Sequence, residues 1–195
     1  MENLKHNLIL ASASPRRKEI LQKAGYNFKI IKSDYNEDIL NKEYSTFLVE
    51  NCAKSKALDV LEKIRNENNF IIISADTVVV LNNIILGKPK DKADAFKILK
   101  SLSNKKHFVS TSICLIKKDD DINIRTATET TEVYFRALED REILAYIETR
   151  KPFDKAGSYG IQDKGFDFCY KIEGELDNVV GFPMELFNNL LKKQL

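Results

Sequence analysis

The sequence predicts an α/β protein with a mixed sheet, flanking helices and two lobes around a central cleft. An apolar run followed by an amphipathic stretch recurs in the first half of the chain, which is typical of βα units. Two long β-type runs joined by the charged turn 118–121 follow later and indicate an antiparallel hairpin. Hydrophobic residues make up 43% of the 195 residues, enough for a full core, so we expect one domain over residues 1–195.

Helix start and stop signals divide the first half of the chain. Ser14 suits a helix N-cap, Pro15 suits the first helical position, and Gly25 suits the position after the helix end. The expected elements are a strand over Leu8–Ser12, a helix over Pro15–Ala24, a strand around 28–31, a loop over Asp34–Lys42, a helix capped by Ser45 or Thr46 and running toward Asn66 with Phe47, Leu48, Ala57, Leu58, Leu61 and Ile64 on its inner face, and a strand over Phe70–Ser74.

Hairpins and glycine-rich loops dominate the rest of the chain. Asn82 and Asn83 indicate a tight hairpin turn, and the glycines from Gly157 to Gly174 indicate a loop-rich return. The expected elements are paired strands over Val78–Leu81 and Ile84–Leu86, a helix from Asp91 through Ser101, strands over Phe108–Lys117 and Ile122–Phe135, a helix over Glu139–Glu148 and a final helix after Pro183.

The charge balance excludes a class of partner. The chain has 31 Lys and Arg against 29 Asp and Glu, and this net charge of +2 is too balanced for a protein that binds nucleic acid along a strongly basic face. A local basic pocket is compatible with this balance. Ser12, Ser14 and Pro15 interrupt the first apolar run, so we expect neither a signal peptide nor a membrane span.

The cysteines and histidines form no recognisable metal or disulfide pattern. Cys52, Cys114 and Cys169 are far apart and odd in number, which favours reduced, buried thiols and a cytoplasmic location. His6 and His107 are isolated, so we expect neither a His-based metal site nor a His-dependent triad. His6 is expected in a flexible terminus and His107 at the start of a strand.

The segment from Ser12 to Arg17 predicts an anion site at a strand-to-helix turn. Free backbone N–H groups and the positive end of the helix dipole favour a phosphate at such a helix start. Arg16 and Arg17 add forked donors that match phosphate oxygens. The sequence therefore predicts a phosphate-handling site within its first two dozen residues.

Asp76 and Thr77 follow the apolar run 70–73, where the predicted strand ends. A carboxylate at such an edge is partly desolvated yet reachable by water, so Asp76 is a candidate metal ligand or general base. An aspartate that caps a turn fits the pattern equally well. Thr77 is either a donor to a substrate oxygen or an ordinary strand residue.

Three further residues are candidates for binding. Lys88 lies on a rigid turn between Gly87 and Pro89, where it reaches a phosphate or is simply solvated. Lys56 lies among apolar helix residues, where it is either functional or extends its stem over the core. Gln162 ends a glycine-rich stretch and either reads a base edge through its amide or lies in an ordinary turn.

These signals occur in an order that resembles the Maf family of nucleoside triphosphate pyrophosphatases. The resemblance covers nearly the whole chain, and its Asp-Thr and Tyr-Gly-Ile-Gln segments are similar to the branch that acts on dTTP and UTP. Ser158 and Phe182 depart only mildly from the commoner residues. The motifs that carry the resemblance are Ser12–Arg17 (SASPRR), Ala75–Val79 (ADTVV), Gly87–Asp91 (GKPKD), Asp154–Gln162 (DKAGSYGIQ) and Val180–Pro183 (VGFP).

The resemblance implies hydrolysis of the α–β phosphoanhydride to a nucleoside monophosphate and pyrophosphate, a divalent metal (Mg²⁺ or Mn²⁺), an inosine triphosphatase-like (Maf-like) fold and frequent homodimers. It implies that Asp76 is the proton acceptor. The residues themselves leave open whether Asp76 deprotonates the water, holds the metal or does both. Glu37 corresponds to an acidic site residue, with Asp34 and Asp38 competing for that place. The remaining roles implied are triphosphate binding by Ser12, Arg16, Arg17, Lys56 and Lys88, with Lys56 and Lys88 assisting catalysis, and base preference set by Arg16, Thr77 and Gln162.

Two other functions stay open at this point. The chain is alternatively a nucleotide-binding regulator of cell division that inhibits septum formation through partners, in which case Asp76 has no catalytic purpose. A purine-cleaning enzyme of the inosine triphosphatase type is a third reading, against which Thr77 and Gln162 argue, and competition between ITP and dTTP distinguishes it.

Overall fold

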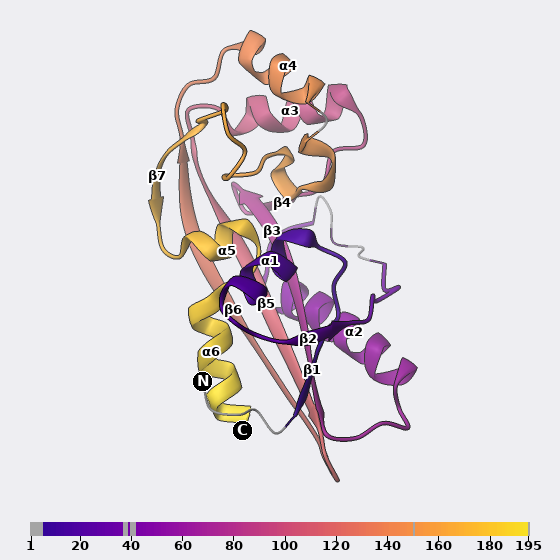
Figure 1. Ribbon diagram of the computed structural model, residues 1–195. Helices are drawn as coiled ribbons and strands as arrows, with labels where there is room; N and C mark the ends of the chain where they lie inside the picture. The colour runs from indigo at the N-terminus through magenta and orange to yellow at the C-terminus, as the bar shows by residue number, and fades with distance from the viewer. Residues whose placement is uncertain (1–5, 37–38, 40–41, 150, 195) are drawn as a thin grey trace.

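The structure is a computed structural model that describes residues 6–36, 39, 42–149 and 151–194, and within these ranges a seven-stranded mixed sheet forms the centre (Figure 1). The strand order is β2-β1-β3-β5-β6-β7, with β4 paired to β3 off this path. The strands β1 and β2 run parallel to their neighbours, and all other pairs are antiparallel. The strands are β1 (Asn7–Leu10), β2 (Phe28–Ile30), β3 (Phe70–Leu81), β4 (Ile84–Leu86), β5 (Lys106–Lys118), β6 (Ile122–Phe135) and β7 (Cys169–Glu173).

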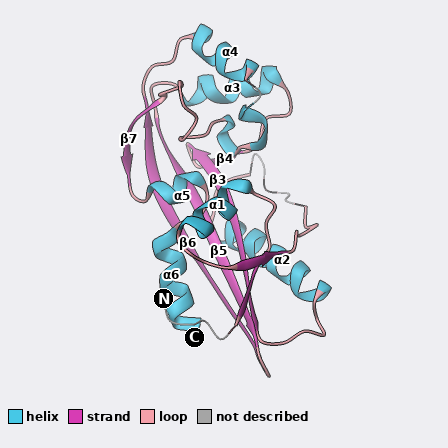
Figure 2. Ribbon diagram, in the orientation of Figure 1, coloured by secondary structure: helices cyan, strands magenta, loops and turns pink. Residues whose placement is uncertain are grey.

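Helices cover both faces of the sheet and form a separate layer at one end (Figure 2). The helix α2 packs on one face through apolar contacts with β1, β3 and β5, whereas α1 and α6 pack on the opposite face. The helices α3 and α4 and the 3-10 segments build a second lobe over the far ends of β3, β5 and β6. The bounds are α1 (Pro15–Lys23), α2 (Thr46–Lys63), α3 (Lys92–Leu102), α4 (Asp140–Glu148), η1 (Lys151–Asp154), η2 (Ala156–Ser158), α5 (Leu176–Val180) and α6 (Met184–Gln194).

The central strand β3 is longer than the sequence predicts. We expected one strand to end at Ser74 and another to begin at Val78, but a single strand runs through both. Its partner β5 supplies the reason, because the register is unbroken from Phe70↔Lys118 to Val80↔Phe108. Asp76 and Thr77 therefore lie inside a strand rather than after one.

The other edge of β3 changes partner along its length. The parallel pairing with β1 ends at Leu10↔Ile73, and the antiparallel pairing with β4 begins at Val79↔Leu86. Residues 74–78 lie between these two partners. Because side chains alternate along a strand, Asp76 extends to the face covered by α2 and Thr77 to the face covered by α1.

The inner face of α2 differs from the predicted one. Phe47 is 69% exposed and Leu58 is 38% exposed, so the prediction was wrong for both. The buried stripe follows the helical spacing of Val49, Ala53 and Val60 instead. Small residues on this stripe let α2 lie close to the sheet, and Lys56 falls on the same stripe. The other residues buried along α2 are Cys52 and Ala57.

Three further local expectations need correction. The side chain of His6 is bound to the rest of the protein, because its Nε2 lies 2.8 Å from Oδ1 of Asp119 in the β5–β6 turn. Cys169 is only half-buried, unlike Cys52 and Cys114, because it lies on the edge strand β7. The strand β7 and the short helix α5 were missed, since short segments between glycines carry little periodicity. Within the described ranges, no helix combines the length and the apolar character that a bilayer crossing requires.

The η2 turn depends on a glycine at the boundary between the lobes. Gly157 has φ +66°, and a Cβ atom there would lie 2.7 Å from Cγ2 of Val79 on β3. Its N–H also donates to the carbonyl oxygen of Gly87 at 3.0 Å. This close approach fixes the loop that carries Asp154 and Tyr159 against the central strand.

We predict that Gly157→Ala lowers the free energy of unfolding by about 3 kcal/mol, because left-handed strain and steric overlap with Val79 add together. Gly165→Ala is the matched control, since Gly165 has φ +85° with no atom within 4 Å of a Cβ. This control should cost only about 1 kcal/mol. Urea unfolding of both variants tests the difference, and equal losses would show that the Val79 contact is not a constraint.

Candidate functional site

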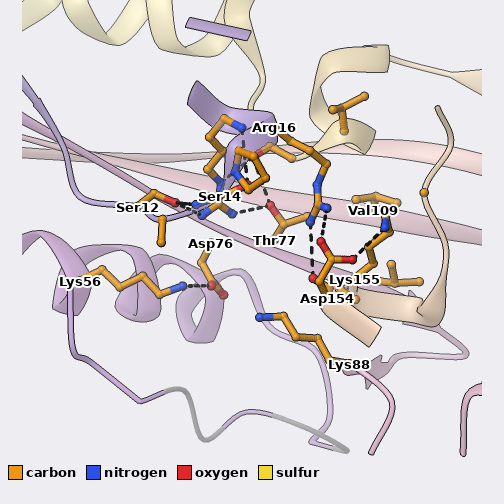
Figure 3. A pocket seen from close by; sticks show the side chains of 18 of the residues that line it. Ser12, Ser14, Arg16, Lys56, Asp76, Thr77, Lys88, Val109, Asp154 and Lys155 are labelled. Carbon is orange, nitrogen blue, oxygen red and sulfur yellow. Dashed lines mark hydrogen bonds and ion pairs between the residues drawn. The ribbon is translucent and has the colours of Figure 1, made fainter. Parts of the chain in front are cut away.

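A polar cleft of about 590 Å³ opens at the edge of β3 where the partner strands change (Figure 3). Its walls come from the β1–α1 turn, from α2, from the loop after β4 and from the η1–η2 segment. Both lobes therefore contribute to it. Among its lining residues are Ser12, Ser14, Arg16, Arg17, Lys32, Lys56, Asp76, Thr77, Lys88, Asp154, Lys155, Tyr159, Gly160, Gln162 and Gly181.

The β1–α1 turn has the predicted capped geometry. Ser14 is the N-cap of α1, and its hydroxyl accepts from the N–H of Arg17 at 3.5 Å. The Oγ of Ser12 accepts from the N–H of Ser14 at 3.2 Å. Pro15 occupies the first turn of the helix. Backbone N–H groups there have no partner within the helix, so the N–H that proline lacks is not needed. The start of α1 therefore lies at the wall of the cleft, as the sequence predicts.

The guanidinium of Arg17 is held from three sides. Its Nε donates to the carbonyl oxygen of Gly181 at 2.9 Å. Its two terminal nitrogens donate to Oγ of Ser12 at 3.3 Å and to Oγ1 of Thr77 at 3.0 Å. These acceptors belong to the β1–α1 turn, to β3 and to the end of α5. Arg17 therefore enters the cleft in a fixed orientation.

Arg16 connects the two lobes. Its Nη1 donates to Oδ2 of Asp154 at 2.6 Å, and the other carboxylate oxygen of Asp154 accepts from Nζ of Lys155 at 2.8 Å. Desolvation acts to raise the pKa of Asp154, but the hydrogen bonds from Lys155 and Arg16 outweigh it and hold this pKa below its usual value. Asp154 is therefore a charged bridge between two cations at the cleft wall.

Lys155 is a buried lysine that the sequence did not single out. It is 8% exposed, and its Nζ donates to the carbonyl oxygen of Lys151 and lies 3.6 Å from Oδ2 of Asp163. Gly160 allows this packing, because a Cβ there would lie 2.7 Å from Cε of Lys155. The available signal was its place in the segment Asp154–Gln162, next to a glycine and a small residue.

Asp76 and Lys56 form an ion pair on the α2 side of the cleft. The Nζ of Lys56 lies 2.5 Å from Oδ1 of Asp76, and the side chains are 12% and 3% exposed. With so little solvent around them, each side chain depends on the other for its polar contact, and removing one partner is costly. Figure 3 shows Lys88 extending toward this carboxylate from the other side. The arrangement places a carboxylate between two lysines.

Tyr159 contributes a wall of the cleft and is held from behind by a histidine. Its hydroxyl lies 2.8 Å from Nε2 of His107 on β5, and the two rings pack edge to face. Burial lowers the pKa of His107 to about 4, so the imidazole is neutral at physiological pH. Burial also raises the pKa of Tyr159 well above its usual value. His107 therefore supports the wall without adding charge.

The structure brings together all the predicted site residues that it describes. Ser12, Arg16, Arg17, Lys56, Asp76, Thr77, Lys88 and Gln162 line the same cleft. Thr77 enters it from the α1 side, whereas Lys88 and Gln162 are exposed at its rim. Glu37 lies outside the described residues, as does its competitor Asp38. Asp34, the other candidate for this acidic position, does lie within the described residues. Its carboxylate accepts from Nζ of Lys63 on α2 at 2.8 Å.

The described residues do not form an all-protein metal centre. Within the ranges that the structure covers, no three His, Cys, Asp or Glu side chains come together as metal ligands. A magnesium ion does not require such a cage, because it commonly binds one or two carboxylates together with substrate phosphates. Asp76 is one of the carboxylates that line the cleft.

The sheet order and the helical layers define the fold class. The structure of a HAM1 protein from Coxiella burnetii matches with a TM-score of 0.57 at 15% identity, over 96% of this chain and 99% of that one. The Staphylococcus aureus Ham1 protein matches with a TM-score of 0.51 at 12% identity, over 97% of this chain and 100% of that one. The predicted inosine triphosphatase-like α/β fold is confirmed.

Sequence comparison narrows this class further. The family model described as Maf-like protein matches residues 7–194, and the chain belongs to the Maf family. A protein named dTTP/UTP pyrophosphatase from Bdellovibrio bacteriovorus is 44% identical over 97% of this chain and 100% of its own length. A protein of the same name from Alkaliphilus oremlandii is 46% identical over 91% of this chain and 90% of its own length.

The neutral His107 predicts a dependence of stability on pH. Its pKa is about 4 in the folded protein against an ordinary value of 6.5, so the unfolded chain binds more protons between these two pH values. The free energy of unfolding should therefore fall as the pH is lowered from 6.5 to 4, with His107 contributing about 3 kcal/mol of the loss. Urea unfolding across this window, compared with His107→Gln, checks the contribution. Identical slopes for the two proteins would contradict it.

Proposed function

We propose that this protein hydrolyses the α–β phosphoanhydride of dTTP and UTP, releasing the nucleoside monophosphate and pyrophosphate. The observation that carries the proposal is the cleft itself, which Asp76 lines beside Lys56 of α2 and which Arg16 and Arg17 line from the start of α1. Relatives that are 42–46% identical carry the name dTTP/UTP pyrophosphatase. The geometry and the relatives point to the same class of substrate.

The charges around the cleft suit a triphosphate. The lining residues of the described chain include six cationic side chains and two carboxylates, which leaves an excess of four positive charges. A nucleoside triphosphate carries about four negative charges, which must be neutralised before a nucleophile can approach phosphorus. The whole chain has a net charge of only +2, so the cations are concentrated at this place. The six cations are Arg16, Arg17, Lys32, Lys56, Lys88 and Lys155, and the two carboxylates are Asp76 and Asp154.

In this proposal Asp76 accepts a proton from the attacking water. Its Oδ1 lies 2.5 Å from Nζ of Lys56, which holds the carboxylate in place for this role. Lys56 also fixes the direction in which the carboxylate presents its oxygens. Arg17, Arg16 and Lys88 bind phosphate oxygens, and Ser12 contributes a hydroxyl at the helix start.

A divalent cation, Mg²⁺ or Mn²⁺, is part of the proposal. Asp76 would hold it together with phosphate oxygens of the substrate, a mode of binding that needs only one or two protein carboxylates. Such an ion supplies neutralisation of the charge that develops on the leaving pyrophosphate. Lys56 then limits the room for further carboxylate ligands beside Asp76.

The base preference is assigned to Arg16, Thr77 and Gln162. Gln162 at the rim offers both a donor and an acceptor through its amide, which suits the edge of a uracil or thymine ring. Glu37 remains a proposed acidic contact. We further propose that residues 1–195 act as one domain, as a homodimer and in the cytoplasm. Analytical ultracentrifugation and cell fractionation check the last two points.

The catalytic role predicts a specific loss of activity. Asp76→Asn keeps the size and a hydrogen-bond acceptor but removes the base, so pyrophosphate release from dTTP and UTP with Mg²⁺ or Mn²⁺ should fall at least about a hundredfold. Asp140→Asn is the matched control, because Asp140 pairs with Lys100 at the same 2.5 Å but lies on α4, away from the cleft. It should retain wild-type rates.

The same assay separates the competing functions. Release from dTTP and UTP in preference to ITP supports the proposal, whereas preference for ITP would favour a purine-cleaning enzyme. Tight nucleotide binding without any release of pyrophosphate by the wild-type protein would reject hydrolysis and favour a nucleotide-binding regulator.

A further inference from the structure

Behind Arg17 lies a chain of hydroxyl groups, of which the proposed function uses only the first, Thr77. Thr77 on β3 accepts from Nη2 of Arg17 at 3.0 Å. Its Oγ1 lies 3.0 Å from Oγ1 of Thr111, the residue directly opposite on β5. Thr111 in turn donates to the carbonyl oxygen of Asn178 on α5 at 3.1 Å. Thr111 and Asn178 are fully buried, so this chain runs from the cleft into the core.

The distances assign a direction to these hydrogen bonds. A hydroxyl has one proton, and Thr111 uses its proton for the carbonyl oxygen of Asn178. Thr77 then donates to Thr111 at 3.0 Å. In the opposite order Thr111 would donate to Thr77, and Thr77 would donate to the carbonyl oxygen of Gly181 over the longer distance of 3.4 Å. The shorter pair of bonds therefore points every proton away from the cleft.

This direction matters because Arg17 has protons to donate and needs acceptors. With its own proton committed to Thr111, the hydroxyl of Thr77 turns a lone pair toward the guanidinium. Without Thr111, the proton of that hydroxyl keeps only the longer contact of 3.4 Å to the carbonyl oxygen of Gly181, so the hydroxyl is held less firmly as an acceptor for Arg17. The hydroxyl of Thr111 thus acts on the cleft through Thr77, without lining it.

Asn178, which accepts from Thr111, also positions a second acceptor of Arg17, the carbonyl oxygen of Gly181. The side chain of Asn178 donates to the carbonyl oxygen of Val109 and to Oγ1 of Thr131, both at 3.0 Å, which ties α5 to β5 and β6. The backbone of Asn178 accepts from the N–H of Gly181 at 3.0 Å. Gly181 then presents its carbonyl oxygen to Nε of Arg17. Thr111 therefore bonds directly to Thr77, one of the three acceptors of Arg17, and to the backbone of Asn178, which in turn holds Gly181, a second of them.

We propose that Thr111 is a positioning residue for anion binding, which holds Arg17 in its orientation through Thr77 and the end of α5. The inference rests on the proposed function only in expecting a polyphosphate as the anion. A guanidinium that is already oriented loses less conformational freedom when it binds phosphate. If Arg17 is no longer held in this orientation, phosphate binding becomes weaker.

The test uses inorganic pyrophosphate as the probe and the full-length protein. Thr111→Val preserves shape and removes the hydroxyl, and it should raise the Kd for pyrophosphate roughly tenfold in calorimetry, with kcat/KM for dTTP falling by a similar factor. Thr111→Ser keeps the hydroxyl and should bind like the wild type. Ser110→Ala is the control, because it removes a fully buried hydroxyl of β5 that contacts Tyr44 and not the cleft. It should also bind like the wild type.

A double-mutant cycle separates positioning from loss of stability. In an Arg17→Ala background, Thr111→Val should add less than a twofold further rise in Kd, because the group that it positions is gone. An undiminished rise in that background, or wild-type binding by folded Thr111→Val, would overturn the inference. Should Thr111→Val not fold, Thr111→Cys, with its weak donor and acceptor, must show the same loss and the same cycle.

The two readouts keep this inference distinct from the proposed function. A wild-type protein that binds pyrophosphate but hydrolyses neither dTTP nor UTP refutes the proposed function, and the calorimetric cycle still decides the role of Thr111. A wild-type protein that binds no pyrophosphate at millimolar concentration overturns the inference directly.

Discussion

The cleft depends on the unequal pairing of the two edges of β3. One edge is bonded to β5 without interruption, which fixes the strand in place along its whole length. The other edge passes from β1 to β4 and leaves residues 74–78 between them. Side-chain alternation then delivers Asp76 and Thr77 to opposite faces from adjacent positions. A carboxylate beside α2 and a hydroxyl beside α1 thus enter one cleft from a rigid support.

The cations of the cleft are held by the protein rather than left to solvent. Arg17 has three acceptors, Arg16 has Asp154, and Lys56 has Asp76. Each of these contacts costs side-chain freedom and desolvation during folding. In return the charges are oriented before any anion arrives, so less ordering remains to be done on binding. The same contacts keep like charges apart in an otherwise cationic cleft.

Much of this arrangement could be predicted from the sequence, because the strongest signals are local. The capping pattern of Ser14 and Pro15 predicted the start of α1, and the ordered motifs predicted which residues would meet in one cleft. The continuity of β3 was not predictable in this way, since it arises from pairing with a strand some forty residues later. The exposure of Phe47 was missed for a similar reason, because helical periodicity does not show where the sheet ends.

The residues behind the cleft were the least visible in the sequence. Thr111 lies in an ordinary β-type segment and Asn178 in a short segment without helical periodicity, and only their buried contacts with Thr77 and Gly181 give them a role. His107 was read correctly as a strand residue, but its contact with Tyr159 joins positions 52 residues apart. Side-chain networks of this kind depend on tertiary distances, for which a single sequence carries no pattern.

The three long strands also limit how the molecule can move. Residues of β3 and β5 contribute apolar side chains to both lobes, with Ile73 and Leu115 in one and Val79 and Val109 in the other. A hinge needs a few linker residues whose dihedral angles can swing freely, and a paired strand offers none. The lobes therefore cannot open by a hinge motion about a flexible linker. Ligands must therefore enter and leave through rearrangement of the rim loops and their side chains.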